Sequence, residues 1–277
     1  MTPRNPKYGP DGLRLSQFMD AYDFADETVI VTGGARGLGR NHSLAFARAG
    51  ADVAVLDVQS EEAETVVERI EREGGRAGAV ECDVADPAEV EAAVEHVTAT
   101  LGPVDVLVNN AGVSRFGRLT DLDAETWRTV LDVNLTGSFL CAKHVAAQMV
   151  EAGTAGAIVN TASMFGHRAI PGLGAYSASK FGVRALTKTL AVELAEHGIT
   201  VTAVSPIGVE TDAVEDYDGA AERFLGEGTT YAGRYNLLDP GERLDPDAVT
   251  EAVLWLASDR SRYVTGHALP VDAGGLV

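Results

Sequence analysis

The sequence predicts an α/β fold with one doubly wound sheet of seven parallel strands flanked by helices. Seven short apolar runs rich in β-branched residues are expected to be strands, at 28–32, 52–57, 78–82, 104–108, 156–161, 199–204 and 267–271. Such runs fit strands that are covered on both faces, as in a parallel sheet. Helical candidates lie between them, at 38–49, 60–73, 87–101, 123–152, 175–197 and 246–257. Strands and helices that alternate in this way imply right-handed crossovers.

The length of 277 residues suits one domain, which we place at 25–277. The first 24 residues are polar and contain three prolines, so we expect either a flexible extension or an arm packed on a neighbouring subunit. The segment 212–245, called the lid segment below, is rich in glycine and contains Tyr217, Phe224, Tyr231 and Tyr235. Long insertions often cover active sites, although a surface excursion used for oligomer contacts is the alternative.

The net charge of −19 argues against nucleic acid or an anionic membrane as partner, because an acidic surface repels phosphate groups. No apolar run is long enough to cross a bilayer, and the polar start of the chain lacks the apolar core of a signal peptide. We therefore expect a cytoplasmic protein. Cys82 and Cys141 lie in apolar elements and are expected to be buried free thiols, with a disulfide or reactive site as the alternative. No metal site is predicted.

A glycine-rich turn, Thr32-Gly-Gly-Ala-Arg-Gly-Leu-Gly39, follows the first predicted strand. Glycines let the backbone approach a pyrophosphate, and the helix N-terminus behind them offers unpaired N–H groups and a partial positive charge. The spacing differs from the usual G-x-G-x-x-G pattern, and a tight turn without a ligand is the alternative. The candidate cofactor contacts in this turn are Gly33, Arg36, Gly37, Leu38 and Gly39.

Asp57 ends the second predicted strand, where a dinucleotide fold places the adenosine ribose. A carboxylate there accepts hydrogen bonds from the ribose hydroxyls and repels a 2′-phosphate, which favours NAD over NADP. Arg36 is the opposing feature, because its guanidinium could bind that phosphate. We weigh Asp57 more heavily and predict NAD.

Polar residues follow three further strands: Asp83-Val84, Asn109-Asn110-Ala111-Gly112 and Ser163. Ligands of open α/β sheets bind beyond the carboxyl ends of the strands, so these residues are expected to line one crevice. Taken singly, each also fits a turn or a helix cap.

Tyr176 and Lys180 are spaced i, i+4, so on a helix they share one face. The pKa of a free tyrosine, about 10, is too high for proton transfer at neutral pH, but an adjacent ammonium lowers it. Ser163 is expected to bind the substrate oxygen. Asn134 is expected to interrupt local helix bonding and hold a water that links Lys180 to solvent. Taken alone, the pair also fits an amphipathic helix with a snorkelling lysine.

With these motifs the chain resembles the short-chain dehydrogenase/reductase family over residues 25–275. Further matching segments are Ser205–Thr211 and TGHALPVDAGG at 265–275. The resemblance implies a Rossmann fold, a catalytic tetrad of Asn134, Ser163, Tyr176 and Lys180, and a homotetramer that packs helices 123–152 and 175–197 across its interfaces. It also implies that Lys180 holds the nicotinamide ribose, that Val209 and Thr211 contact the carboxamide, and that Asn110 lies at the ribose. The remaining implied cofactor contacts are Asp83, Val84, Ala111, Gly112, Tyr176 and Pro206.

The segment Pro206-Ile-Gly-Val-Glu-Thr211 departs from the family's usual Pro-Gly-x-Val-x-Thr. This variant is similar to carveol-dehydrogenase-like members, which oxidise cyclic terpenoid alcohols. Those members carry an insertion after the second strand, associated with a cofactor that does not exchange freely. The ordinary separation of Asp57 and Asp83 shows that the insertion is missing here.

We therefore predict an NAD-dependent oxidoreductase that interconverts a small neutral secondary alcohol and a ketone, with Tyr176 as acid and base. Met164, Phe165 and His167 follow Ser163 and are expected to wall the substrate pocket. Acidic residues in the lid segment disfavour an anionic substrate: Asp212, Glu215, Asp216, Asp218 and Glu222. The alternatives are an NADPH-dependent reductase of 3-oxoacyl thioesters and a non-catalytic nucleotide sensor on the same scaffold.

Strong acidity with only four lysines among the 22 basic residues suggests adaptation to concentrated salt. Because salt screens the self-repulsion of a −19 chain, we expect its unfolding temperature to rise between low salt and molar KCl. Thermal unfolding followed by circular dichroism measures this. An unfolding temperature that does not rise would remove the case for such adaptation.

Overall fold

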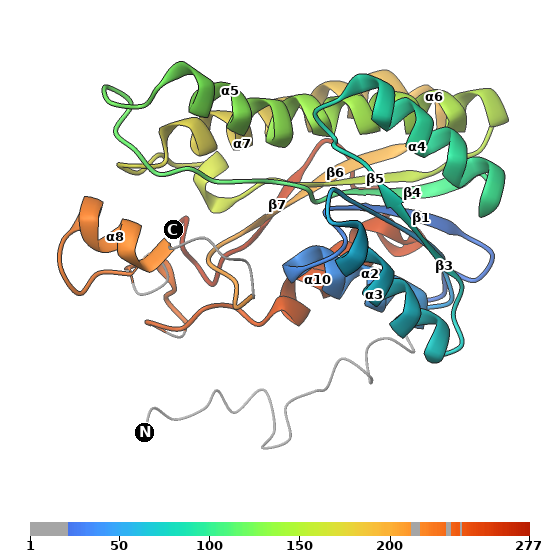
Figure 1. The fold of residues 1–277 in the computed structure, drawn as a ribbon, viewed down its shortest axis with the longest axis horizontal. Coiled ribbons are helices and arrows are strands. Elements are labelled where there is room, and N and C mark those ends of the chain that lie inside the picture. The colour runs from blue at the N-terminus through green and yellow to red at the C-terminus, as the bar shows by residue number, and fades with distance from the viewer. Residues whose placement is uncertain (1–21, 212–216, 231–233, 239) are drawn as a thin grey trace.

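A computed structural model describes residues 22–211, 217–230, 234–238 and 240–277. It contains one sheet of parallel strands in the order β3-β2-β1-β4-β5-β6-β7, which confirms the predicted doubly wound fold (Figure 1). The strands are β1 (Thr28–Thr32), β2 (Asp52–Asp57), β3 (Ala77–Glu81), β4 (Val104–Asn109), β5 (Ala157–Thr161), β6 (Thr200–Pro206) and β7 (Ala268–Val271). The strand order reverses between β1 and β4, the place where such sheets bind ligands.

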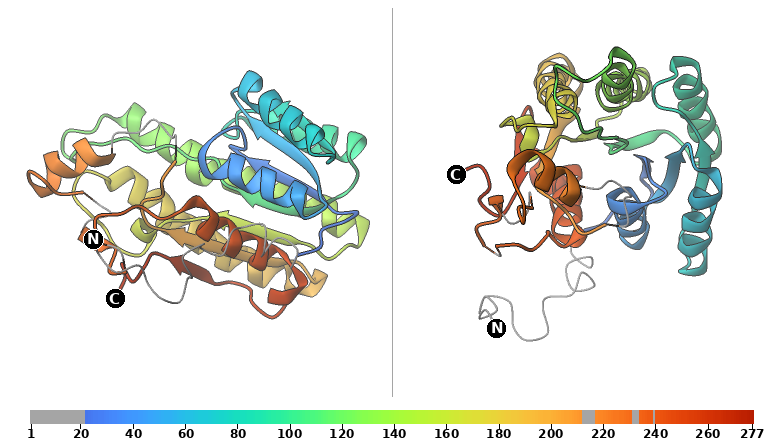
Figure 2. Two further views of the ribbon diagram at one scale, coloured as in Figure 1. Left: turned by 90° about the horizontal axis from the view of Figure 1, so that it is seen from below. Right: turned by 60° about the vertical axis from the view of Figure 1, so that its left-hand side comes forward.

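Helices cover both faces of the sheet. They are α2 (Gly37–Arg48), α3 (Ser60–Arg72), α4 (Pro87–Thr100), α5 (Ala124–Leu131), α6 (Gly137–Ala152), α7 (Gly174–Leu194), α8 (Tyr217–Leu225) and α10 (Pro246–Ala257). In Figure 1, α4 to α7 form the layer above the sheet, and α2, α3 and α10 form the layer below it. The right-hand view in Figure 2 shows the same two layers from another side.

The central strands alternate their side chains between two hydrophobic cores. Val29 and Val31 of β1 pack with Phe46 of α2 on one face, whereas Ile30 packs with Cys141 of α6 on the other. The period of two residues therefore divides a continuous apolar run between both helix layers. Cys82 and Cys141 are buried free thiols, as expected, and burial raises the pKa of each to about 12.

The stretch 123–152, expected as one helix, is divided by a π-helical turn, η1 (Asp132–Thr136), between α5 and α6. The Gly137 N–H donates to the carbonyl oxygen of Asp132, five residues earlier. This turn therefore contains one residue more than a turn of α-helix. Asn134 lies inside it and is fully buried. The interruption expected at Asn134 is therefore present, as a wider turn rather than a break.

The lid segment contains helix α8, which the sequence pattern did not predict. Residues 212–216, 231–233 and 239 lie outside the described part of the chain, and with them Asp212, Glu215, Asp216 and Tyr231. Most of the predicted N-terminal extension lies outside it too. Phe24 is buried and meets Phe46 edge to face at a centroid distance of 4.9 Å, which anchors the start of the domain to α2.

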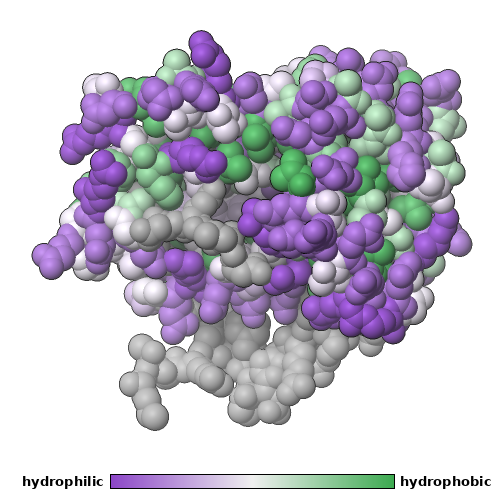
Figure 3. All heavy atoms as spheres, viewed as in Figure 1, coloured by the Kyte–Doolittle hydropathy of each residue, from purple (hydrophilic) through white to green (hydrophobic). Residues whose placement is uncertain are grey.

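Hydrophilic side chains cover most of the face that Figure 3 shows, as the charge of the chain leads one to expect. Among the described residues, no helix is both long and apolar enough to span a bilayer.

Acidic side chains gather around Glu27, which directly precedes β1. Burial raises the pKa of Glu27 to about 7, and nearby carboxylates of Asp105, Asp259 and Asp23 add to the effect. The Asp105 carboxylate accepts the Thr28 N–H at 2.8 Å and is thereby held beside Glu27. Folding therefore takes up a proton at Glu27.

Since the pKa of Glu27 is about 7 in the folded chain and 4.5 when unperturbed, the stability that its protonation contributes is complete below pH 4.5 and is lost as pH rises through 7. We expect Glu27→Gln to raise the free energy of unfolding above pH 7, by about 1 kcal/mol after allowance for solvent screening. Urea unfolding across this pH range measures it. Glu95→Gln, on the exposed face of α4, changes the net charge equally and should not flatten the pH dependence. An equal effect of both variants would contradict the assignment.

Candidate active site

The glycine-rich turn brings the backbone of β1 against the start of α2. Gly33 and Gly37 have φ angles of 61° and 52°, which glycine adopts without strain. A Cβ on Gly39 would lie 1.9 Å from the Gly33 carbonyl oxygen. The N-cap residue Arg36 supplies no side-chain hydrogen bond to the helix end. The turn therefore offers main-chain groups at the N-terminus of α2, the arrangement that binds phosphates in dinucleotide folds.

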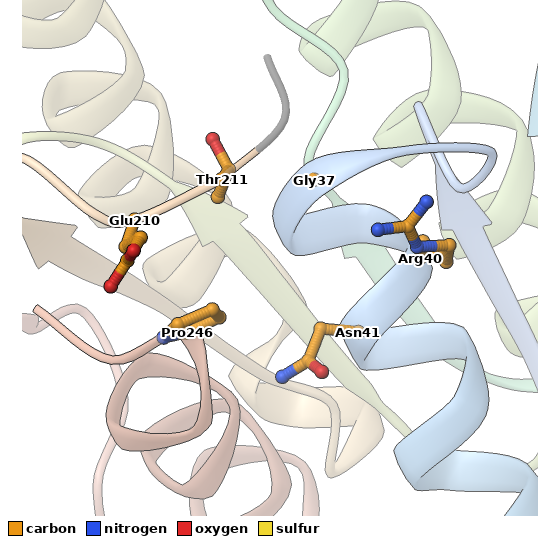
Figure 4. A pocket seen from close by; sticks show the side chains of 6 residues that line it. All are labelled: Gly37, Arg40, Asn41, Glu210, Thr211 and Pro246. Carbon is orange, nitrogen blue, oxygen red and sulfur yellow. The ribbon is translucent and has the colours of Figure 1, made fainter.

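A pocket of about 350 Å³ opens beside this helix end (Figure 4). It is lined by Gly37, Arg40, Asn41, Glu210, Thr211 and Pro246, which come from α2, the segment after β6 and the start of α10. Gly37 and Thr211 were predicted as cofactor contacts, and a Cβ on Gly37 would lie 3.5 Å from Thr211 Cβ. Arg40 and Asn41 were not predicted as pocket residues. Their position one turn into the helix after the glycine-rich turn is the feature of the sequence that could have indicated them.

Asp57 is nearly buried at the end of β2. Its Oδ2 accepts the Ala35 N–H at 3.1 Å, and its Oδ1 accepts the Gln59 N–H at 3.1 Å. The carboxylate therefore supports the glycine-rich turn. Arg36 and Asp83 are exposed at the same edge of the sheet. Val84, by contrast, is buried against Gly137 of α6.

Thr32 and Asn110 tie the turn to the end of β4. The Thr32 hydroxyl accepts the N–H groups of Asn110 and Ala111, each at 3.0 Å. The Asn110 side chain donates to the carbonyl oxygens of Thr32 and Gly33, at 3.0 and 3.2 Å. Asn110 therefore holds the glycine-rich turn, and Thr32 is a positioning residue that the sequence pattern did not single out.

Lys180 is 3% exposed on α7 and reaches the carboxyl end of β5. Its Nζ donates to the Thr161 carbonyl oxygen at 2.7 Å and lies 5.7 Å from the centre of the Tyr176 ring. A Cβ on Gly112 would be 3.6 Å from Nζ, so the loop after β4 passes close to the ammonium. Tyr176 and Lys180 therefore lie side by side on α7, as their spacing predicts.

Asn134 joins the same group from the π-helical turn. Its Oδ1 accepts the Val113 N–H at 2.8 Å, and its Nδ2 donates to the Val113 carbonyl oxygen at 2.9 Å. Nδ2 also donates to the Ser179 hydroxyl at 3.0 Å, and that hydroxyl donates to the Tyr176 carbonyl oxygen at 2.7 Å. One buried amide thus connects the loop after β4 with the helix that carries Tyr176.

Ser163 follows β5 and begins the short turn η2 (Met164–Gly166), where its hydroxyl accepts the Phe165 N–H at 3.1 Å. Met164 and Phe165 belong to a hydrophobic cluster that includes Tyr176. His167 instead meets the Ser205 hydroxyl at 2.9 Å. Its burial, with the Arg184 guanidinium nearby, lowers its pKa. His167 therefore has a structural partner in Ser205.

The remaining predicted contacts lie on the segment after β6. Pro206 ends β6, and Val209 forms a parallel bridge with Leu244. The Glu210 N–H donates to the Leu244 carbonyl oxygen at 2.9 Å, which anchors this segment before it reaches Thr211.

The pattern of the short chain dehydrogenase family matches residues 27–221. The chain belongs to the short-chain dehydrogenase family. Members of the family are oxidoreductases that act on CH–OH groups, so this short-chain dehydrogenase is an enzyme of that class.

Three similar proteins differ in what they act on. A 2,5-dichloro-2,5-cyclohexadiene-1,4-diol dehydrogenase of Sphingobium indicum is 37% identical over 91% of this chain and 98% of its own. A 3-oxoacyl-acyl-carrier-protein reductase of Staphylococcus aureus is 38% identical over 90% of this chain and 97% of its own. The crystal structure of carveol dehydrogenase from Mycobacterium avium in complex with NAD has a TM-score of 0.84 and 33% identity, over 91% of this chain and 98% of that one. The predicted likeness to carveol dehydrogenase is confirmed.

The contact made by Gly39 generates a direct test of the dinucleotide site. We expect Gly39→Ala to weaken NAD binding by about tenfold or more, because the new Cβ would displace the turn. Isothermal titration calorimetry measures the binding. Gly78→Ala is the matched control, since a Cβ there meets only Leu101, at 4.0 Å. A Gly39→Ala variant that binds NAD normally would contradict the placement.

Proposed function

We propose that this enzyme is an NAD-dependent dehydrogenase that oxidises a compact, uncharged cyclic secondary alcohol to a ketone, with Tyr176 as the proton acceptor. The observation that carries the proposal is that Tyr176, Lys180 and Asn134 lie together beside the loop after β4, which is itself bonded to the glycine-rich turn. Ser163 follows the neighbouring strand β5. A nucleotide sensor would not need this group.

When bound, NAD supplies the hydride acceptor. Ser163 holds the substrate hydroxyl oxygen, and the Tyr176 phenolate takes the hydroxyl proton as the hydride leaves the carbinol carbon. The Lys180 ammonium favours the phenolate form of Tyr176 and binds the nicotinamide ribose. Asn134 fixes the Val113 peptide and, through Ser179, the main chain of Tyr176. In the reverse direction Tyr176 returns the proton to the ketone oxygen.

The residues at the glycine-rich turn fit a dinucleotide. Gly39 lets the start of α2 lie directly against the Gly33 carbonyl oxygen, where any Cβ would collide, and the N-terminus of α2 opens on a polar pocket. Asp57 supports the choice of NAD over NADP, because its carboxylate, held by two main-chain N–H groups, would face a 2′-phosphate with a negative charge. A similar protein, carveol dehydrogenase, has NAD bound.

Two observations support a cyclic, uncharged substrate. The carveol and cyclohexadiene-diol dehydrogenases act on ring alcohols, as their names state. Tyr176 also packs against an apolar cluster that includes the buried side chains of Met164, Phe165 and Leu173. Helix α8 of the lid segment packs on the same cluster, so we propose that this segment covers the substrate.

Reduction of a 3-oxoacyl thioester with NADPH is the second candidate, favoured by the similarity to the Staphylococcus aureus reductase. This reaction requires Asp57 to tolerate the 2′-phosphate of NADPH. It also requires the apolar cluster beside Tyr176 to admit an acyl chain on its thioester arm.

We also propose a cytoplasmic homotetramer. Phe139 on α6, with Phe181 and Val192 on α7, exposes apolar surface that burial between subunits would remove from water. Two reduced cysteines suit a reducing compartment.

The function is tested by following the absorbance of the reduced nicotinamide. Cyclic secondary alcohols are offered with NAD or NADP, and 3-oxoacyl thioesters with NADH or NADPH. We expect turnover of a ring alcohol with NAD, and Tyr176→Phe to lower kcat by about 100-fold to 10,000-fold while NAD binding persists. Tyr263→Phe, which removes an exposed phenol, is the control. An active Tyr176→Phe variant, or a thioester reduced with NADPH in preference, would refute the proposal.

A further inference from the structure

A wall of aromatic side chains lies next to Tyr176. Phe116, Tyr217 and Phe224 are partly buried against the same hydrophobic cluster as Tyr176, which also contains Phe165. These rings come from three separate places in the chain: the loop after β4, helix α8 and the turn η2. Basic side chains lie over two rings of this cluster: the Arg223 guanidinium is 5.2 Å from the centre of the Phe224 ring, and the Arg168 guanidinium is 4.5 Å from the centre of the Tyr235 ring.

Tyr217 is held at the first residue of α8 by contacts with the loop after β4. The Ser114 hydroxyl donates to the Tyr217 hydroxyl oxygen at 2.8 Å. The Phe116 ring meets the Tyr217 ring edge to face, with a centroid distance of 5.2 Å and an interplanar angle of 88°. Ser114 is 2% exposed, so this hydrogen bond is largely shielded from water.

The same short loop is fixed to the catalytic group. Val113, the residue before Ser114, is bonded through both its N–H and its carbonyl oxygen to the Asn134 side chain. Asn134 is bonded in turn to Ser179, one residue before Lys180. The Tyr217 ring is therefore linked to Tyr176 and Lys180 through a short series of hydrogen bonds and sequence neighbours.

We propose that Tyr217 is a specificity-determining residue and that Ser114 is the residue that positions it. Held in this way by Ser114 and Phe116, the Tyr217 ring would close one side of the substrate site, which favours a compact ring and excludes long flexible chains. This inference rests on the proposed oxidation of a cyclic alcohol and names the side chains that select it.

The test compares kcat/KM with NAD for cyclohexanol and for 2-decanol in the wild type, Ser114→Ala, Tyr217→Phe and the double variant. Each single variant removes the shielded hydrogen bond between Ser114 and Tyr217, so we expect KM for cyclohexanol to rise about threefold to tenfold, with kcat unchanged. The preference for cyclohexanol over 2-decanol should fall by a similar factor. The double variant should be no worse than the more affected single variant, since both remove the same bond.

The controls separate this role from a general loss of structure. NAD affinity and the pH profile of kcat should not change, because the catalytic group is untouched, and Tyr263→Phe should match the wild type. An unchanged preference in both single variants, or equal losses for both alcohols, would overturn the role of the Ser114–Tyr217 pair. A wild type that oxidises no ring alcohol would instead refute the proposed function. If one single variant does not fold, the other decides.

Discussion

The arrangement of the site depends on one buried positive charge, the ammonium of Lys180. Removing an ammonium from water is unfavourable unless polar groups replace the lost hydration. Here the Thr161 carbonyl oxygen accepts from Nζ, and the loop at Gly112 and the Tyr176 ring lie close by. A buried ammonium contributes little to stability compared with an apolar side chain at the same place. Next to a phenol, however, it would stabilise the phenolate form. The burial of Lys180 is therefore best explained by chemistry at Tyr176.

The sheet brings the partners of that charge together. Parallel strands end at one edge, so the turn after β1, the loop after β4 and Ser163 after β5 lie at the same edge although they are far apart in the sequence. The π-helical turn adds Asn134, which an uninterrupted helix would orient differently. Because Asn134 bonds both main-chain groups of Val113, it also extends the ordered region to Ser114 and the aromatic wall.

Local patterns in the sequence predicted the strands to within two residues and the convergence of Tyr176 with Lys180, because both depend on regular spacing. The sequence indicated that the helix predicted at 123–152 is interrupted at Asn134. It did not indicate the π-helical form of the interruption, which depends on a hydrogen bond between Gly137 and Asp132. The pair Ser114 and Tyr217 left no signal, since residues 103 positions apart meet only through the tertiary fold. Helix α8 was missed for a related reason: the glycines and charges around it suggest a loop, and packing on the apolar cluster stabilises it.

The most direct measurement is the pH dependence of hydride transfer in single turnovers with NAD and a ring alcohol, for the wild type and Lys180→Met. If the buried ammonium favours the phenolate, the wild-type rate reaches half of its plateau well below the pH at which a free phenol ionises, about 10. In Lys180→Met, which retains the apolar stem, that midpoint moves towards the free phenol value. An unchanged midpoint would show that Lys180 does not govern the ionisation of Tyr176, and would contradict the account.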